Sequence, residues 1–465
     1  MNDKYKMTSL EWRASVGLAS IFGLRMLGLF LILPVFAVYA SHLPGGDNRT
    51  LIGLALGTYG LTQAILQIPL GMLSDRYGRK RIIYIGLLLF ALGSFVAASA
   101  HSIHMVILGR AIQGSGAIAA AVIALAADLT REEHRTKAMA LIGMTIGVTF
   151  SISLVLAPAL NQWIGVPGIF ALTGVLALLG MLVVFAGVPN PQITRFHSDA
   201  EAVPAQFMSV LRNTQLLRLN FGIFSLHVVL MSMFVVIPFA LIKTSGLDVN
   251  HHWEVYLPVM LASFVLMVPA IIYGEKKAKL KQVFVAAIGL MLAAQLLLIF
   301  LVRDFWGIVA LLFAFFVAFN ILEATLPSLI SKIAPAGSKG TAIGVYNSFE
   351  FFGAFLGGAA GGLLSHYYGA AYVFAFGSAL IGIWLLLAMS MKAPPAVRSM
   401  MYHVEEMDAE RAKWLSQRLA ALDGVTEAVV VAEEGVAYLK VRMGGWDEQG
   451  ALNLIGERKE HGISE

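Results

Sequence analysis

Long apolar runs dominate most of the chain. They recur up to residue 391 and are separated by short polar segments. Because a membrane-spanning helix needs about 20 mostly apolar residues, each run predicts one such helix. We expect twelve spans, at 14–39, 51–73, 82–100, 104–127, 138–160, 166–187, 218–242, 254–273, 282–302, 305–330, 341–364 and 371–391.

The longest interior polar stretch, residues 188–217, divides the twelve spans six and six. Its second half, "AQFMSVLRNTQLL", is typical of a short amphipathic helix at the membrane interface. The two halves also share a short basic loop at the same place, since "GMLSDRYGRKR" follows the second span and "YGEKKAKLKQ" follows the eighth. Parallel repeats of this kind are typical of transporters.

The pattern changes near Lys392, where "KAPPAVR" breaks away from the membrane. Asp408 can cap a helix that carries Leu415, Leu419 and Leu422 on one stripe and stops near Gly424. "VTEAVVVA-EEG-VAYLKVRM" then predicts a hairpin of alternating strands. The resulting β-α-β-β-α order predicts a small ferredoxin-like α+β domain with the last strand missing or shortened.

These patterns predict an all-α membrane protein with an appended soluble domain. The predicted units are an N-terminal six-helix half at 1–190, a linker at 191–217, a C-terminal six-helix half at 218–392 and the ferredoxin-like domain at 399–465.

Composition agrees with this division and excludes several function classes. Only 13% of residues are charged and the mean hydropathy is +0.77, whereas soluble domains carry about 25% charged residues. Cysteine is absent, which excludes disulfides and thiolate metal sites. No Walker A motif is present, so ATP is not expected to drive transport. The first span lacks a cleavage site and is interpreted as retained.

The net charge of +5 reflects topology rather than nucleic-acid binding. The loops after the even-numbered spans hold 15 Lys and Arg residues, and the loops after the odd-numbered spans hold 3. By the positive-inside rule, we expect the basic loops and both termini to be cytoplasmic.

The stretch "GMLSDRYGRKR" (71–81) raises a physical problem at Asp75, which falls at the C-terminal end of its predicted helix. A carboxylate there is repelled by the helix dipole and needs a partner. Arg79 and Lys80 are candidates. Another is the N-terminus of the span that starts near Gly340, where free amides favour an anion.

A solvated topology loop is the plainer explanation of the same stretch. It accounts for Arg76 and the other bases, but it leaves Asp75 unexplained. Gly71 and Gly78 would allow another helix to come close.

Three motifs together carry a family resemblance. "GMLSDRYGRKR" resembles motif A of the major facilitator superfamily, and "LGRAIQGSGA" in the fourth span resembles its motif B. "GMTIGVTFSISLVLAPAL" in the fifth span resembles motif C of the drug–proton antiporters, with Ala157 before Pro158 where glycine is usual. The chain is therefore identified as similar to drug:proton antiporter-like members of that superfamily, in a bacterial inner membrane.

The resemblance also implies roles for matched residues. Asp75 would contact the start of the eleventh span, and Arg79 would pair with Asp128 at the end of the fourth. These contacts would form a latch that locks the outward-open state and breaks when the inside opens.

Two arginines fall inside apolar spans, where charge is expensive and partners are expected. Arg110, with Gln113 one turn on, is expected to face the bundle interior, although snorkelling to the outer interface is an alternative. Arg25 lies near the middle of the first span, where we expect it to line a cavity or to pair with a buried acid.

Three titratable residues also fall within spans of the second half: Glu323, Glu350 and His227. Desolvation disfavours an ionised carboxyl, so either acid could take up and release a proton. The alternative is that each is neutral and only bonds between helices.

Amides could complete a polar cavity, or tie helices together at roughly 0.6 kcal/mol per bond. The candidates are Gln63, Gln67, Gln113, Asn320 and Asn347. The surroundings are rich in Phe and Met, for example Phe224, Met231, Phe234 and Phe351, which favours an apolar or amphipathic substrate.

We therefore expect a monomeric secondary transporter that exports a small molecule through the lipid bilayer, driven by the proton gradient and without a cofactor or metal. An uncoupled facilitator or importer is one alternative, and a membrane sensor that signals through the C-terminal domain is another. That domain lacks Cys-x-x-Cys, so metal carriage is not expected, and regulation, partner binding or oligomerisation remain open. No nucleophile–base pair or metal cluster at membrane depth predicts an enzyme.

Overall fold

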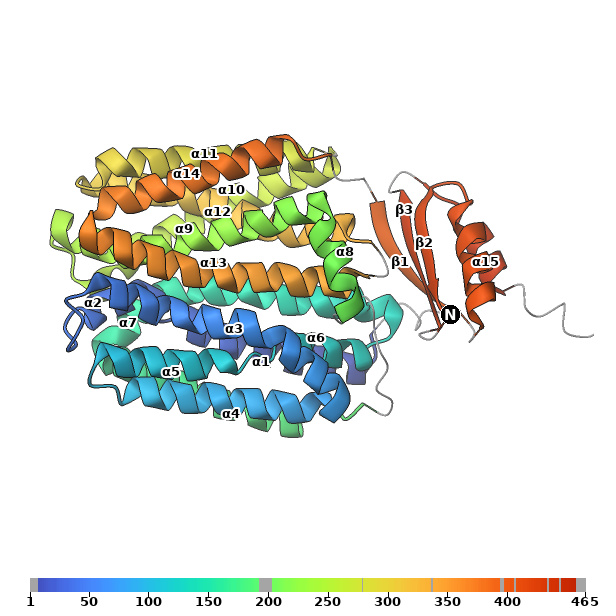
Figure 1. The fold of residues 1–465 in the computed structure, drawn as a ribbon, viewed down its shortest axis with the longest axis horizontal. Helices are drawn as coiled ribbons and strands as arrows, with labels where there is room; N and C mark the ends of the chain where they lie inside the picture. Colours follow the sequence, from blue (N-terminus) through green and yellow to red (C-terminus); the bar gives the residue numbers. More distant parts are fainter. Residues whose placement is uncertain are drawn as a thin grey trace, which may run out of the picture.

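A computed structural model describes residues 7–191, 203–277, 279–335, 338–393, 397–404, 407–432, 435–442 and 445–456. It consists of a helical bundle with a small α/β domain at one end (Figure 1). We call this end of the bundle the domain end and the other the far end.

The first half of the bundle is formed by α1 (Ser9–Phe30), α2 (Leu33–Ala40), α3 (Arg49–Tyr77), α4 (Arg79–Ala98), α5 (Ile103–Ser115), α6 (Ala119–Asp128) and α7 (Glu132–Ala186). The second half contains α8 (Phe207–Arg212), α9 (Thr214–Ser245), α10 (Trp253–Lys276), α11 (Leu280–Leu301), α12 (Phe305–Ile333), α13 (Lys339–Tyr367) and α14 (Ala370–Met389), with short 3-10 turns at Pro204–Gln206 and Val249–His251.

Within the described residues, ten helices are long and apolar enough to cross a membrane. One is α7, which contains two predicted spans that turn sharply at Gly165 (φ 66°), so the expected 161–165 loop is a tight kink. Helix α13 is not among the ten, although it has 29 residues, because it is rich in glycine. Counting α7 twice and adding α13 accounts for all twelve predicted spans.

Two spans contain breaks that hydropathy did not predict. The first is interrupted between α1 and α2, just before Pro34, and the fourth between α5 and α6 at Gly116. Proline removes a helical hydrogen bond, which explains the first break.

The C-terminal domain confirms the predicted β-α-β-β-α order. Its elements are β1 (Val397–His403), α15 (Ala409–Ala420), β2 (Val425–Val431), β3 (Val436–Arg442) and α16 (Glu448–Gly456). The strands are antiparallel in the order β1-β3-β2, and Asp408 caps α15 by accepting a bond from the Arg411 amide at 2.7 Å. The predicted absence of a last strand concerns residues that lie partly outside the described ones.

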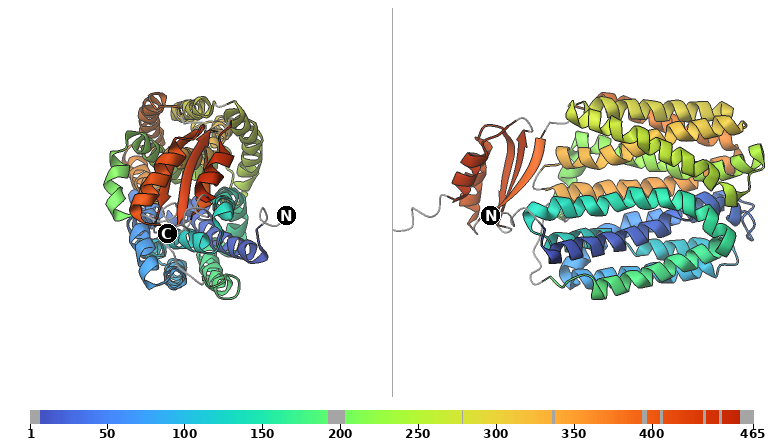
Figure 2. Two further views of the ribbon diagram at one scale, coloured as in Figure 1. Left: turned by 90° about the vertical axis from the view of Figure 1, so that its right-hand side faces the viewer. Right: turned by 180° about the vertical axis from the view of Figure 1, so that it is seen from behind.

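The sheet of this domain faces the bundle, and its helices lie on the other side (Figures 1 and 2). Lys440 is buried on the bundle-facing surface, where it pairs with Glu427 at 3.0 Å and donates to the Ala334 carbonyl after α12. Arg135 of α7 contacts the Met401 sulfur at 3.8 Å. Because α7 and α12 belong to different halves, the domain touches both of them.

The two halves meet most closely along α3 and α13, where glycines replace larger side chains. A methyl group on Gly53 would lie 2.0 Å from the Gly358 carbonyl oxygen, and one on Gly57 would lie 2.6 Å from that of Phe355. Such close backbone approach is typical of small residues in membrane helices. These contacts lie toward the far end.

Two hydrogen bonds also join the halves at the far end. Arg49 donates to the Ser365 hydroxyl at 3.0 Å, and the Asn161 amide donates to Asn250 at 2.7 Å. The far end is therefore closed in this structure.

Gly53→Ala should open the far end, because its methyl group cannot fit against the α13 backbone. Spin labels on Asp47→Cys and Tyr368→Cys in this naturally cysteine-free chain should then report longer distances by pulsed electron resonance. Gly289→Ala is the matched control, since a methyl group there meets nothing within 4 Å. Equal distance distributions in the two variants would contradict the packing argument.

Candidate functional site

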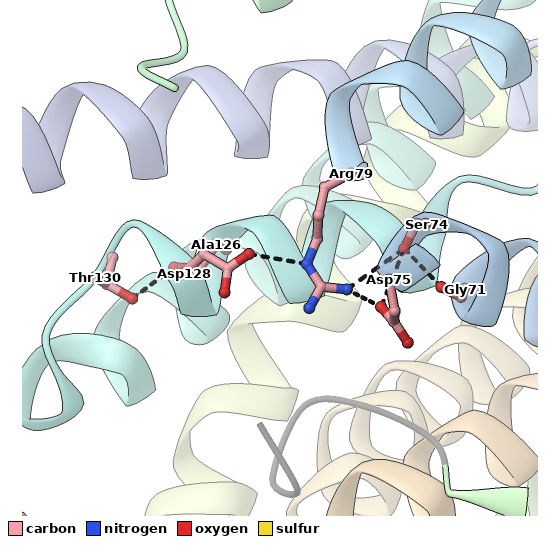
Figure 3. A network of polar contacts seen from close by, with 7 residues as sticks. All are labelled: Gly71, Ser74, Asp75, Arg79, Ala126, Asp128 and Thr130. Carbon is pink, nitrogen blue, oxygen red and sulfur yellow. Dashed lines mark hydrogen bonds and ion pairs between the residues drawn. The ribbon is translucent and has the colours of Figure 1, made fainter. Parts of the chain in front are cut away.

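A charged cluster joins three helices at the domain end (Figure 3). Gly78 ends α3 with a φ of 99°, and this turn places Arg79 at the start of α4. The Arg79 Nε donates to Asp128 at 2.9 Å, and its Nη1 pairs with Asp75 and approaches the Ser74 hydroxyl at 3.4 Å. The Arg79 side chain is 2% exposed and that of Asp128 is 0% exposed.

Both carboxylates in this cluster occupy helix C-termini, Asp75 on α3 and Asp128 on α6. Each is unfavourable there because the dipole of its own helix is negative at that end. One arginine therefore offsets two unfavourable positions and holds α3, α4 and α6 together.

The Arg79–Asp128 pair implied by the family resemblance is present in this structure, in which the far end is closed. Arg79, Asp75 and Asp128 all belong to the first half, so their ion pairs hold helices of that half together. The role of the pair in locking an outward-open state stays a prediction.

Asp75 and Gly340 do face one another across the halves. Both line a cleft between α3, α6 and α13 whose volume is about 40 Å³, enough for three or four waters at roughly 10–15 Å³ each. Its other lining residues include Gln67, Gly71, Met72, Ala120, Gly344 and Asn347. The implied contact of Asp75 with the start of α13 stays a prediction.

The remaining residues of the predicted latch have other roles. A methyl group on Gly71 would meet Ala120 at 2.8 Å, so Gly71 brings α3 close to α6 of its own half. Lys80 donates to the Val188 carbonyl, and Arg76 lies over the Tyr77 ring. At the α13 N-terminus, the Thr341 hydroxyl accepts from the Val203 amide at 2.8 Å.

A second cluster assembles the three titratable residues that the sequence could only treat separately. His227 of α9, Glu323 of α12 and Glu350 of α13 offer ligand atoms that lie within 4.8 Å of one another. A cluster that could hold a metal thus exists at membrane depth, contrary to our sequence-based expectation. Its components come from three helices, so no spacing along the chain could reveal it.

The contacts of His227 indicate where protons lie on its ring and between it and Glu350. Its Nδ1 is 3.2 Å from the Ile223 carbonyl, which can only accept, so Nδ1 carries a hydrogen. Its Nε2 faces a Glu350 oxygen at 3.5 Å. Two acceptors would repel each other there, so the arrangement favours a proton on one of them.

Arg25 approaches this cluster from the first half. It is 2% exposed, its Nη2 donates to the Tyr59 hydroxyl at 2.9 Å, and it also bonds the Gln63 side-chain oxygen. Among the described residues, its Nε and Nη1 have no hydrogen-bond partner. The ring of its partner Tyr59 lies 6.4 Å from that of Phe351, the residue next to Glu350 on α13 of the other half.

Arg110 is fully buried rather than snorkelling, and it is fully bonded. Its Nη1 donates to Gln113 at 2.6 Å, its Nε and Nη2 donate to the carbonyls of Ala55 and Leu56, and its guanidinium lies over the Tyr59 ring. Gln113 in turn donates to Ser94 at 2.8 Å. These residues tie helices of one half together.

The other predicted cavity amides divide by position. Gln67 crosses between the halves and donates to Ser348 at 2.9 Å, whereas Asn320 ties α12 to α10 through Ser263 at 2.8 Å. Asn347 lines the cleft and Gln63 lies beside Arg25.

The sequence analysis did not identify Glu11 of α1. Glu11 is buried and pairs at 2.9 Å with Arg131, which directly precedes α7.

Comparison with known proteins identifies the family. Residues 18–358 match the family model of the Major Facilitator Superfamily. The inner membrane transport protein YajR of Escherichia coli (strain K12) is 47% identical over 441 residues, which cover 95% of this chain and 96% of that protein. This chain belongs to the major facilitator superfamily. It is therefore a multi-pass membrane transporter.

A more distant relative and a solved structure are also similar to this chain. The quinolone resistance protein NorA of Staphylococcus aureus (strain COL) is 26% identical, over 78% of this chain and 93% of that protein. The crystal structure of a bacterial homolog to the human lysosomal transporter Spinster, in an inward-facing and occupied conformation, has a TM-score of 0.67 at 13% identity, covering 83% of this chain and 97% of that one. It shows the shared fold.

Loss of Asp128 should destabilise the protein far more than loss of Asp75. Asp128→Asn leaves the buried Arg79 charge without its shielded partner, at a cost of about 3–5 kcal/mol. Asp75 is 35% exposed, so water screens its attraction to Arg79, and Asp75→Asn should lower the stability by less. Thermal unfolding in detergent measures both, with the exposed Asp47→Asn as control. Equal losses for the two variants would contradict the assignment of Asp128 as the main partner.

Proposed function

We propose that this transporter exports a small amphipathic compound in exchange for protons across a bacterial inner membrane, with the domain end cytoplasmic. The observation that carries the proposal is the cluster of His227, Glu323 and Glu350, together with Arg25, whose partner Tyr59 has its ring 6.4 Å from that of Phe351 beside Glu350. The base-rich loops and the name of the Escherichia coli relative support the location.

The proton would act by controlling the charge that faces Arg25. In this proposal the shared proton lies on the Glu350 oxygen and is donated to His227 Nε2, so the carboxyl is neutral and exerts little attraction on Arg25. Release of that proton leaves a carboxylate that Arg25 attracts across the interface of the halves. Protonation thus biases the equilibrium between two positions of the halves, as alternating access requires.

Aromatic rings beside the cluster suit an amphipathic substrate. The Phe319 ring lies 6.4 Å from that of His227 and 5.2 Å from that of Phe150, so rings from both halves converge. NorA, a distant relative, is named for resistance to quinolones, which are amphipathic molecules. Export of this type of compound is therefore the direction we propose.

A sensor role is the second candidate. One observation favours it, namely that the C-terminal domain touches both α7 and the end of α12. Movement of the halves would change these contacts and could be read by a partner of that domain.

Glu350→Gln should abolish proton exchange, because an amide cannot bind and release the proton. Everted membrane vesicles with a preformed pH gradient should show substrate-induced proton release for the unmodified protein but not for Glu350→Gln, and a reduced release for Glu323→Gln. A panel of quinolones and lipophilic amines serves as the substrate set, and the exposed Glu254→Gln is the control. Substrate flux that ignores the pH gradient would overturn the proposal.

A further inference from the structure

Several buried polar atoms at the centre of the bundle have no hydrogen-bond partner among the described residues. They are the Nε and Nη1 of Arg25, the Nε2 of Gln63, the Oε2 of Glu323 and the hydroxyl of Tyr346. A buried polar group without a partner is costly, and in native proteins it calls for an explanation.

Arg110 shows that this fold can provide a hydrogen-bond partner for every nitrogen of a buried arginine. It is 0% exposed, and its Nε, Nη1 and Nη2 all have partners in its own half. Arg25 is buried to nearly the same degree, but it bonds only Tyr59 and Gln63 through one nitrogen. Its two remaining nitrogens are therefore available to a ligand.

Among these unpartnered groups, those of the first half are donors, and the second half supplies carboxyl acceptors. Arg25 and Gln63, on α1 and α3, leave hydrogen-bond donors, and Gln63 is 0% exposed. Glu323 on α12 leaves an acceptor, and Glu350 beside it adds a second carboxyl. A molecule complementary to both sides carries an acceptor at one end and a donor at the other.

We infer that this centre binds a zwitterionic amphipathic molecule, with its carboxylate against Arg25 and Gln63 and its ammonium against Glu323. The inference rests on the proposed function, because it takes the centre of the bundle as the substrate site. The Nε and Nη1 of Arg25 are donors of a cationic group, so each can give a charge-assisted hydrogen bond to a carboxylate oxygen. The Phe319 and Phe351 rings, beside His227 and Tyr59, are placed to contact the apolar part.

The cleft at the domain end ends close to this centre. It is lined by Gln67 and Asn347, which lie one helical turn from Gln63 and Glu350 respectively. At the centre, the ammonium of the bound molecule would compete with the proton for the same carboxyls, so binding and proton release would be linked.

Matched ligands can separate the two ends of the site. Norfloxacin is a zwitterion with a carboxylate and a piperazine amine; its methyl ester keeps only the cation, and its N-acetyl derivative keeps only the anion. Corresponding triplets on other quinolones and on an amino-acid arylamide scaffold extend the set. Equilibrium binding to the purified full-length protein in detergent, without a pH gradient, is the readout.

Each zwitterion should bind about tenfold or more tightly than either of its singly charged derivatives, the effect of one charge-assisted hydrogen bond. Arg25→Met should remove the preference for acid over ester, and Glu323→Gln the preference for amine over amide. Lys243→Met and Glu254→Gln, both exposed, should change neither. If Arg25→Met fails to fold, Arg25→Lys decides, and it should weaken the acid while leaving the ester unchanged.

Three results would overturn the inference: esters that bind as well as acids, an acid preference that survives substitution of Arg25, or no binding by any zwitterion in the set. The last result would mean that water alone fills the site. Failure of proton exchange with the binding pattern intact would instead remove only the proposed function. Proton exchange that is intact, together with esters and amides that bind as well as the zwitterions, would remove only this inference.

Discussion

The rule that a charge inside an apolar bundle must find a partner organises this protein. An ionised group at membrane depth is expensive, so each one either pairs or marks a site. Arg79 satisfies the rule with Asp75 and Asp128, and Arg110 satisfies it with backbone carbonyls and Gln113. These arginines stabilise the first half as a unit, which is what a rigid-body transport movement requires.

The same rule distinguishes the centre of the bundle from those structural ties. Among the described residues, Arg25 keeps two donor nitrogens without partners, and its partner Tyr59 lies against Phe351 of the other half, beside Glu350. Groups on opposite sides of a moving interface cannot be satisfied in every state. A proton or a substrate that bonds these groups can therefore stabilise one state over the other. In this way its binding energy can drive the movement of the halves.

The sequence alone was sufficient for the architecture because membrane helices and basic loops leave local signals. The twelve spans, the β-α-β-β-α domain and the family all follow from periodicity and motifs. Tertiary contacts do not. The meeting of His227, Glu323 and Glu350 depends on how three helices are rotated about their axes. The helix breaks before Pro34 and at Gly116 were also not predicted from hydropathy, because a break in a helix need not change the apolar composition.

The central claim is that the buried cluster holds an exchangeable proton beside Glu350. Infrared difference spectroscopy during a pH titration tests it most directly, because a protonated carboxyl has a carbonyl stretch that a carboxylate lacks. The account predicts a band of a protonated carboxyl that titrates in the unmodified protein, is lost in Glu350→Gln and is retained in Glu254→Gln. A spectrum with no titrating carboxyl band, or one in which Glu350→Gln leaves the band unchanged, would contradict it.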